Sequence, residues 1–190
     1  TVTGVQTCAL PIWLEKRVMM PHLQNTTHIN YRLLSPDPIR IELRPYVAFR
    51  LHEAPVSHPV AAPYALQALG DRFEIAPGGD LPPLRLFLHG ADKAFTVLPQ
   101  TFERAAYALE QNRGYESSGD LWSPGYFRLT LSPQSAGTLI GSTESWETIG
   151  ALNPLELPSA ERQRRSRLLD CAKRVPRTGM PAELVLAADQ

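Results

Sequence analysis

The side chains best suited to chemistry lie close together between positions 113 and 125, in a stretch rich in turn-forming residues. Aromatic side chains there can stack on the flat face of a ligand ring, while charged side chains can hydrogen-bond its polar groups. The candidate ligand-binding residues are Arg113, Tyr115, Asp120 and Trp122. In the structural alternative, which is the more common case, Trp122 and Tyr126 pack a seam between domains and Asp120 caps the turn.

The other titratable groups form no pattern that supports catalysis or metal binding. Glu144 and Glu147 are three positions apart after an expected strand, where a solvated turn is the simpler interpretation. His52 and His58 flank a proline-rich segment that lacks the cysteine and carboxylate spacing of a metal site. The sequence also has no glycine-rich phosphate-binding loop. We therefore assign no catalytic residue, no metal ligand and no cofactor.

The composition argues against several classes of function. The chain has 190 residues, with 19 basic and 19 acidic side chains and a formal net charge of zero. This balance argues against a nucleic-acid-binding surface and against a polybasic membrane surface. No apolar run approaches the roughly 18 residues of a membrane span. The 18 prolines lie among strand-like segments, which favours a β domain with long connections over a helical bundle.

The segment that must position the candidate residues is an alternating stretch over residues 39–51. Apolar residues occupy every odd position except Pro45, and the even positions are mostly polar or amphipathic. A period of two places one set on each face of a strand, which at this length would span roughly 40 Å. Pro45 cannot donate to a strand ladder, so it marks a bulge, a bend or an edge. A long half-buried strand needs a second sheet over its apolar face, which predicts an antiparallel β-sandwich.

The order of strands and turns predicts two hairpins. Residues 27–34 are expected to pair with 39–51, and residues 126–131 with 138–143, because proline-containing turns separate them. Residues 113–125 between the hairpins are expected to form a loop. Residues 52–69 are also expected to be a loop, with at most a short helix near 64–69. Further strands are predicted at 72–76, 84–89 and 95–98, and residues 101–111 fit either a strand or a short helix.

The character of the chain changes after residue 153. A helix is predicted over residues 158–173, with Ser159 as its N-cap, and it should end before Pro176. Another helix is expected to open at Pro181. Basic residues dominate the first helix and its end, and we interpret them as a solvated or domain-contacting surface rather than a nucleic-acid site. They are Arg162, Arg164, Arg165, Arg167, Lys173, Arg174 and Arg177.

The first twelve residues have a different origin from the rest in our interpretation. Residues 2–12, VTGVQTCALPI, look like the translation of a sequencing-adaptor primer, so residues 1–12 are excluded from the fold as not native. The alternative is an ordinary N-terminal strand. Without Cys8 only Cys171 remains, which excludes an internal disulfide and favours a reducing compartment. We expect the chain to be a fragment cut at both ends.

Four stretches in a fixed order carry a resemblance to a known family. They are LEKRVMMPH (14–22), QNTTHINYRLL (24–34), LRPYVAFR (43–50) and DLWSPGYF (120–127). Together they resemble the N-terminal domain of bacterial and archaeal glycogen debranching proteins, the amylo-α-1,6-glucosidase family. The closing LVLAADQ (184–190) is similar to the opening of the catalytic domain of that family.

This resemblance implies a mainly β fold, an incomplete antiparallel β-supersandwich over residues 13–153. A C-terminal α-helical connector over residues 154–190 would lead into an α/α six-hairpin barrel. In that family two carboxylates of the barrel hydrolyse α-1,6-glucosidic branch points, one as general acid and one by activating water. Both would lie beyond Gln190, so the fragment alone is expected to be inactive.

The implied partners are this barrel and glycogen or a branched α-glucan in the cytoplasm, with neither nucleic acid nor membrane. Tyr115 and Trp122 would then stack on sugar rings, and Arg113 and Asp120 would bond hydroxyls. The alternative function is a stand-alone carbohydrate-binding or scaffold β-sandwich without catalytic activity.

Overall fold

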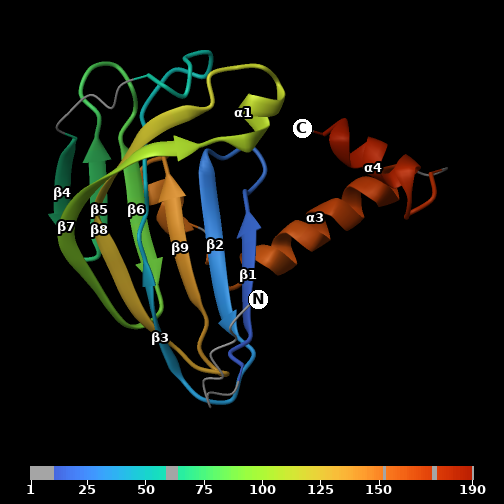
Figure 1. Ribbon diagram of the computed structural model, residues 1–190. Helices are drawn as coiled ribbons and strands as arrows, with labels where there is room; N and C mark the ends of the chain where they lie inside the picture. Colours follow the sequence, from blue (N-terminus) through green and yellow to red (C-terminus); the bar gives the residue numbers. More distant parts are fainter. Residues whose placement is uncertain (1–10, 59–63, 152, 173–174, 190) are drawn as a thin grey trace, which may run out of the picture.

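Two antiparallel sheets packed face to face form the body of the protein in a computed structural model (Figure 1). It describes residues 11–58, 64–151, 153–172 and 175–189. Within these residues one sheet has six strands, in the order β1-β2-β9-β6-β5-β4, and the other has three, in the order β3-β8-β7. The strands are β1 (Leu14–Met19), β2 (Thr26–Leu33), β3 (Ile39–Leu43), β4 (Ala65–Leu69), β5 (Arg72–Ala76), β6 (Leu84–His89), β7 (Ala91–Ala106), β8 (Ser118–Leu131) and β9 (Gly137–Ser142). The predicted mainly β sandwich is confirmed.

The core lies between the two sheets and is built by alternation along the strands. On β8, Phe127, Leu129 and Leu131 point inward and are at most 2% exposed. They meet the inward residues of the six-stranded sheet, and three phenylalanines join the layers at ring centroid distances of 4.4 to 5.2 Å. The buried cluster comprises Leu33, Tyr64, Ile75, Leu86, Leu88, Phe127, Leu129, Leu131 and Leu139.

Both predicted hairpins are wrong, because each turn carries the chain from one sheet to the other. β2 pairs with β1 and β9, whereas β3 pairs with β8 in the opposite sheet. Residues 34–38 form a connection longer than a two-residue hairpin turn, so the chain can cross to the opposite sheet instead of folding back beside β2. At the second crossing Gly137 passes directly over the core, where a Cβ would lie 2.0 Å from Leu129 Cδ1.

The long alternating strand is shorter than predicted. β3 ends at Leu43, two residues before Pro45, and lies at the edge of the three-stranded sheet. The chain returns to β8 only at Val47, whose backbone exchanges hydrogen bonds of 2.8 and 2.9 Å with Trp122. Pro45 thus ends a strand at a sheet edge, as its missing N–H requires.

Three other expectations need correction. Residues 65–69 form strand β4, paired with β5, instead of a short helix. The expected loop over residues 113–125 is confined to its first residues, because β8 begins at Ser118. Residues 101–111 contain both alternatives, the end of β7 and the helix α1 (Ala108–Asn112). In the first two cases pairing with a neighbouring strand overrides local propensity, whereas α1 keeps the helical spacing of its sequence.

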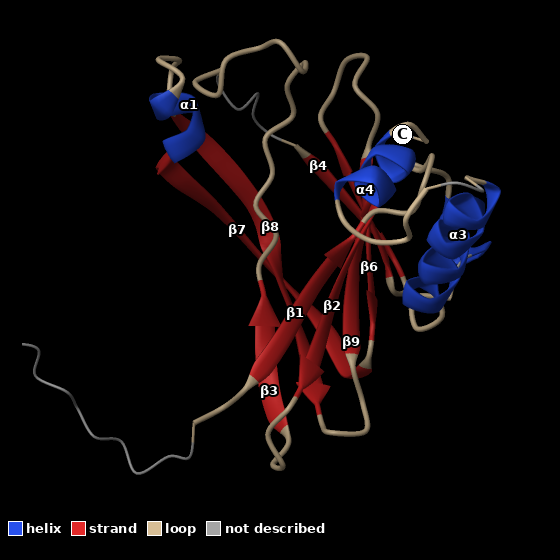
Figure 2. Ribbon diagram, turned by 90° about the vertical axis from the view of Figure 1, so that its right-hand side faces the viewer, coloured by secondary structure: helices blue, strands red, loops and turns tan. Residues whose placement is uncertain are grey.

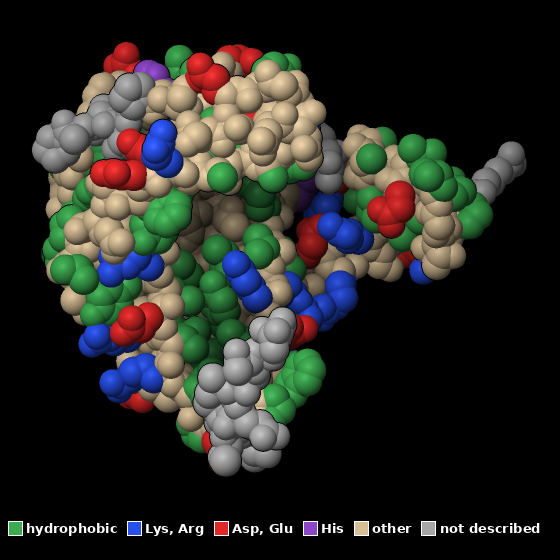
Figure 3. Space-filling view, viewed as in Figure 1, with side chains coloured by type: hydrophobic (Ala, Val, Ile, Leu, Met, Phe, Trp, Pro, Cys, Tyr) green, Lys and Arg blue, Asp and Glu red, His purple; other side chains and the backbone are tan. Residues whose placement is uncertain are grey.

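The three-stranded sheet leaves part of the larger sheet uncovered. Leu14 and Val18 of β1 lie opposite Leu33 and Ile29 of β2, on the face that turns toward the core. Their exposed fractions are nevertheless 40% and 58%. Figure 3 shows this side hollowed, with hydrophobic side chains gathered in the hollow.

Three helices follow the last strand: α2 (Trp146–Ala151), α3 (Leu157–Cys171) and α4 (Met180–Ala187). Figure 2 shows α3 and α4 on the outer side of the six-stranded sheet. α3 begins at Leu157, earlier than predicted, and Ser159 is not its N-cap, since the Ser159 hydroxyl donates to the Glu156 carbonyl at 2.6 Å. The Arg164 and Arg165 guanidiniums hold the pKa of Glu161 down to about 2, and Arg164 also pairs with Asp189 after α4.

No helix within the described ranges is long and apolar enough to cross a membrane. The predicted adaptor segment lies outside the described residues except for positions 11 and 12. The domain boundaries at residues 12 and 153 stay predictions.

Candidate functional site

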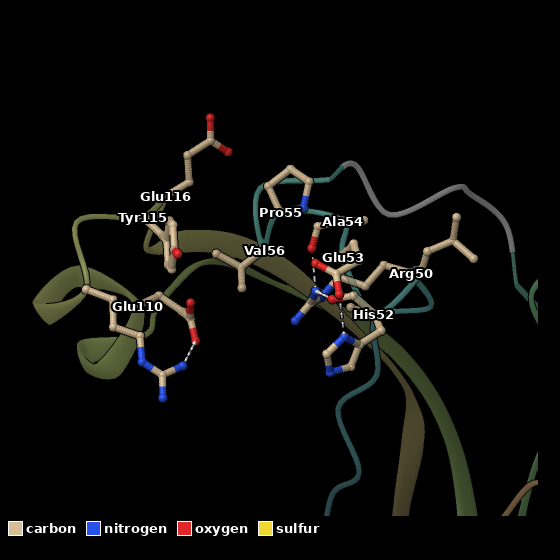
Figure 4. Close-up of a pocket in the computed structure, with 12 residues that line it drawn as sticks. Arg50, His52, Glu53, Ala54, Pro55, Val56, Glu110, Tyr115 and Glu116 are labelled. Atoms are coloured by element: carbon tan, nitrogen blue, oxygen red, sulfur yellow. Dashed lines mark hydrogen bonds and ion pairs between the residues drawn. The ribbon is translucent and has the colours of Figure 1, made fainter.

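A cleft of about 780 Å³ separates the chain after β3 from the turn between α1 and β8. Figure 4 shows Glu110, Tyr115 and Glu116 on one side and Arg50, His52 and Glu53 on the other, with Val56 between them. The cleft therefore joins two segments about sixty positions apart in sequence. The complete lining is Ala48, Arg50, Leu51, His52, Glu53, Ala54, Pro55, Val56, Glu110, Arg113, Tyr115 and Glu116.

Backbone hydrogen bonds fix the wall formed by α1 and the following turn. The Tyr107 amide donates to the Ser117 carbonyl at 2.8 Å, which closes the turn at the ends of β7 and β8. The Tyr115 amide donates to the Glu110 carbonyl at 3.0 Å. Between them Gly114 adopts a φ of +78°, a conformation that glycine reaches without steric cost. The turn thereby holds Tyr115 at the rim.

The opposite wall depends on a close approach of two backbones. A Cβ on Gly119 would lie 1.9 Å from the Val56 carbonyl oxygen, so only glycine lets residues 50–57 lie against β8 there. The Arg50 guanidinium bonds the Ala54 carbonyl and stabilises the turn within this wall. The Ser57 hydroxyl donates to the Glu116 carboxylate and connects the two walls.

The chemistry of the cleft suits a neutral, hydroxyl-rich ligand. The Tyr115 ring is 68% exposed and can stack on an apolar ring face. Arg113 forms an ion pair of 3.7 Å with Glu110, and its exposed guanidinium keeps donors free for a ligand. Positive and negative groups alternate around the opening, which supplies both donors and acceptors to hydroxyl groups.

The carboxylates of the cleft do not have the environment of a catalytic acid. The Glu53 side chain is 96% exposed and lies 3.3 Å from His52, and Glu116 is engaged by Ser57. A general acid requires a carboxyl group in an apolar or like-charged environment. The cleft is thus equipped for binding rather than for bond cleavage.

Of the four predicted ligand-binding residues, the structure brings Arg113 and Tyr115 together in the cleft. Asp120 lies outside it, and its carboxylate accepts a 2.8 Å hydrogen bond from the Arg104 amide. Trp122 packs edge-on against Tyr64 with 5.4 Å between ring centroids and contacts the core. Asp120 thus fastens β8 to β7, and Trp122 supports the sandwich.

Sequence reasoning missed the wall that carries Arg50, Glu53 and Val56. Those residues lie in an irregular segment with no motif, and long-range contacts such as the pairing of Val47 with Trp122 bring them to the turn. The one available signal was Gly119, because a glycine inside a strand often marks a close backbone approach.

The described residues contain no group of three or more His, Cys, Asp or Glu side chains that could hold a metal ion. Glu144 and Glu147 do not pair either, since Glu144 accepts a 3.0 Å hydrogen bond from the Asn25 amide and Glu147 lies in α2.

The fold is that of a β-sandwich domain with a cleft at one end of its strands. Residues 6–138 match the family described as "Glycogen debranching enzyme N terminal", a match that covers more than half of the chain. The chain therefore belongs to this family and is an N-terminal domain of the glycogen debranching enzyme type. Comparison with curated proteins and with solved structures found no match.

Proposed function

We propose that this domain serves an enzyme that hydrolyses α-1,6-glucosidic branch points of glycogen. The observation that carries the proposal is the family match over residues 6–138. The domain itself contributes binding and support, and the chemistry belongs to a catalytic α/α-barrel domain with two carboxylates. On its own the 190-residue chain should not cleave glucan.

The cleft supports a role in holding the polysaccharide. A glucose ring has apolar faces and a rim of hydroxyl groups, which match an exposed aromatic ring flanked by charged groups. Tyr115 supplies the stacking surface, and Arg113 supplies hydrogen-bond donors beside it. We assign these two residues to substrate contact, with Arg50 on the opposite wall as a further donor.

The helices after β9 would form the connection to the barrel. α3 and α4 extend beyond the sandwich (Figure 1), and ion pairs between Glu161, Arg164 and Asp189 fix one helix against the other. A cytoplasmic location agrees with the free, exposed thiol of Cys171, which is typical of a reducing compartment.

The test is an assay of glucose release from a branched α-1,6 substrate, run with the chain alone and with the longer enzyme that contains it. We expect activity only in the longer enzyme. In that enzyme Arg113→Ala combined with Tyr115→Ala should raise KM for glycogen without changing kcat, since binding outside the reacting centre is uniform.

The control substrate is a small chromogenic glucoside, which is too short to reach the cleft. The longer enzyme and its Arg113→Ala, Tyr115→Ala variant should hydrolyse it equally. Glucose release by the 190-residue chain alone would contradict the proposal. So would a longer enzyme without debranching activity.

A further inference from the structure

A second cavity, of about 410 Å³, lies on the outer face of the six-stranded sheet, where α2 covers it. Its floor crosses three neighbouring strands, because Phe87 of β6 lies opposite Arg72 of β5 on one side and Ile140 of β9 on the other. Its cover comes from α2 and the residues that follow. The lining is Arg72, Phe87, His89, Ile140, Trp146, Ile149, Gly150, Asn153 and Pro154.

The cavity combines an aromatic wall with a cation beside it. Trp146, at the start of α2, is half-buried, and the Arg72 guanidinium carbon lies 5.3 Å from the centroid of its ring system. Phe87 adds a second, half-buried aromatic ring to the floor. Arg72 is solvent exposed, so its donors can serve a bound ligand without first leaving a buried partner.

This set of groups fits a neutral ring with hydroxyl groups on its edge. The indole of Trp146 offers an apolar stacking surface, and Arg72 offers hydrogen-bond donors at the mouth of the cavity. A single arginine facing aromatic and aliphatic walls gives little support for a phosphate or a carboxylate cluster, which usually takes several cations.

We propose that this cavity is a binding site for glucose units of an α-linked glucan, with Trp146 as the stacking residue and Arg72 as the hydrogen-bonding residue. The identity of the glucan rests on the proposed function, whereas the geometry of the site does not. The cavity lies on the outer face of one sheet, and the Tyr115 cleft lies at the turn between α1 and β8. One chain would therefore hold a branched polysaccharide at two places.

The test is a titration of the 190-residue chain with maltotriose, followed by tryptophan fluorescence. The chain has three tryptophans, of which Trp146 alone lines this cavity. We expect saturable quenching in the wild type. Isothermal titration calorimetry, which needs no tryptophan reporter, should give a dissociation constant for maltotriose about tenfold higher in Trp146→Ala than in the wild type, the size expected for the loss of aromatic stacking.

Trp13→Ala is the matched control, because Trp13 is 66% exposed and lies far from the cavity in sequence and sheet position. It should retain the wild-type dissociation constant. Because Trp146 also packs α2, Trp146→Ala can lower stability as well as binding. Arg72→Ala is a second variant at an exposed position, and it should weaken maltotriose binding without lowering the thermal midpoint of unfolding.

Absence of a saturable response in the wild type would overturn the proposal, as would wild-type binding by folded Trp146→Ala and Arg72→Ala. An equal response to the β-linked cellotriose would overturn the assignment to α-glucans. If only the proposed function fails, the longer enzyme will lack debranching activity, but maltotriose will still change the fluorescence of Trp146.

Discussion

The two halves of the β7–β8 ribbon differ in what their side chains do. In the half near residues 95 and 127, two phenylalanine rings pack with 4.7 Å between centroids, and Leu129 is fully buried. In the half near residues 102 and 120, Phe102 is 50% exposed and Arg104 adopts a positive φ of 55°. The same pair of strands is thus core at one end and cleft support at the other.

The difference shows where binding surfaces can arise in a sandwich. In the core half β8 alternates strictly from Phe127 to Leu131 and is fixed by burial of apolar area, while β7 has one register shift there, between Ala91 and Ala94. The cleft half contains register shifts between Val97 and Gln100 and between Phe102 and Ala105, and its shape depends on single contacts. Mutations should therefore affect stability in the first half and cleft geometry in the second.

The largest effect is expected from Leu129→Ala in the core half. Leu129 is 0% exposed, so its truncation should lower the free energy of unfolding by about 2–5 kcal/mol, through lost burial and a new cavity. Val97→Ala is the control on the same ribbon, since Val97 is 61% exposed and should cost less than about 0.5 kcal/mol. Urea unfolding measures the free energy of unfolding of both variants. Equal losses in the two variants would contradict the proposed difference in burial along the ribbon.

Gly119→Ala should have the next largest effect. The new Cβ would meet the Val56 carbonyl oxygen at 1.9 Å, so a backbone must move, at a cost of about 1–3 kcal/mol. Gly150→Ala is the control, because its Cβ meets nothing within 4 Å. Thermal unfolding compares the two variants, and an unperturbed Gly119→Ala would show that the segment around Val56 does not rest on β8.

A smaller loss is expected from Asp120→Ala. It removes the hydrogen-bond acceptor of the Arg104 amide and should lower the free energy of unfolding by about 1 kcal/mol. Asp120→Asn retains an oxygen acceptor and should recover most of that free energy. Hydrogen exchange at Arg104 reports the bond directly. If Asp120→Ala instead weakens glucan binding at unchanged stability, Asp120 contacts ligand, and its assigned role of fastening β8 to β7 is wrong.

The smallest effect concerns a buried polar residue away from the ribbon. His28 is 4% exposed, and burial lowers its pKa below the ordinary value of 6.5. The unfolded chain then binds the proton more readily, so the free energy of unfolding falls as pH drops below 6.5. Arg17 is the charged group that lines the same small cavity, together with residues of the connector before α3.

His28→Leu should flatten this pH dependence, measured by urea unfolding between pH 7 and pH 5. His52→Leu is the control, since the His52 side chain is 98% exposed and its removal should leave the slope unchanged. An identical slope in wild type and His28→Leu would show that the buried imidazole is not the source.

Much of the fold was predictable because alternation is a local property. The strands at 72–76 and 84–89 were predicted with their observed bounds. The sandwich was predicted from the apolar face of residues 39–51, of which only 39–43 form strand β3. Strand partners were not predictable in this way. Whether a proline-containing turn joins neighbours in one sheet or crosses to the other depends on packing between the sheets, which no local pattern encodes.

The candidate site was predictable only in part, for the same reason. Arg113 and Tyr115 were identified because turn residues and aromatic residues coincide there. Arg50 and Glu53 reach the cleft through a long-range backbone pairing of Val47 with Trp122. Trp122 itself was misplaced because the start of β8 at Ser118 extends a strand through turn-forming residues.

The most direct measurement is an amide NMR titration of the 190-residue chain with a branched α-glucan oligosaccharide. The account predicts chemical-shift changes at residues 50–56 and 110–116, which line the cleft, and none along 127–131 in the core half. Shift changes confined to the core half, or none at the cleft while the oligosaccharide binds elsewhere, would contradict it.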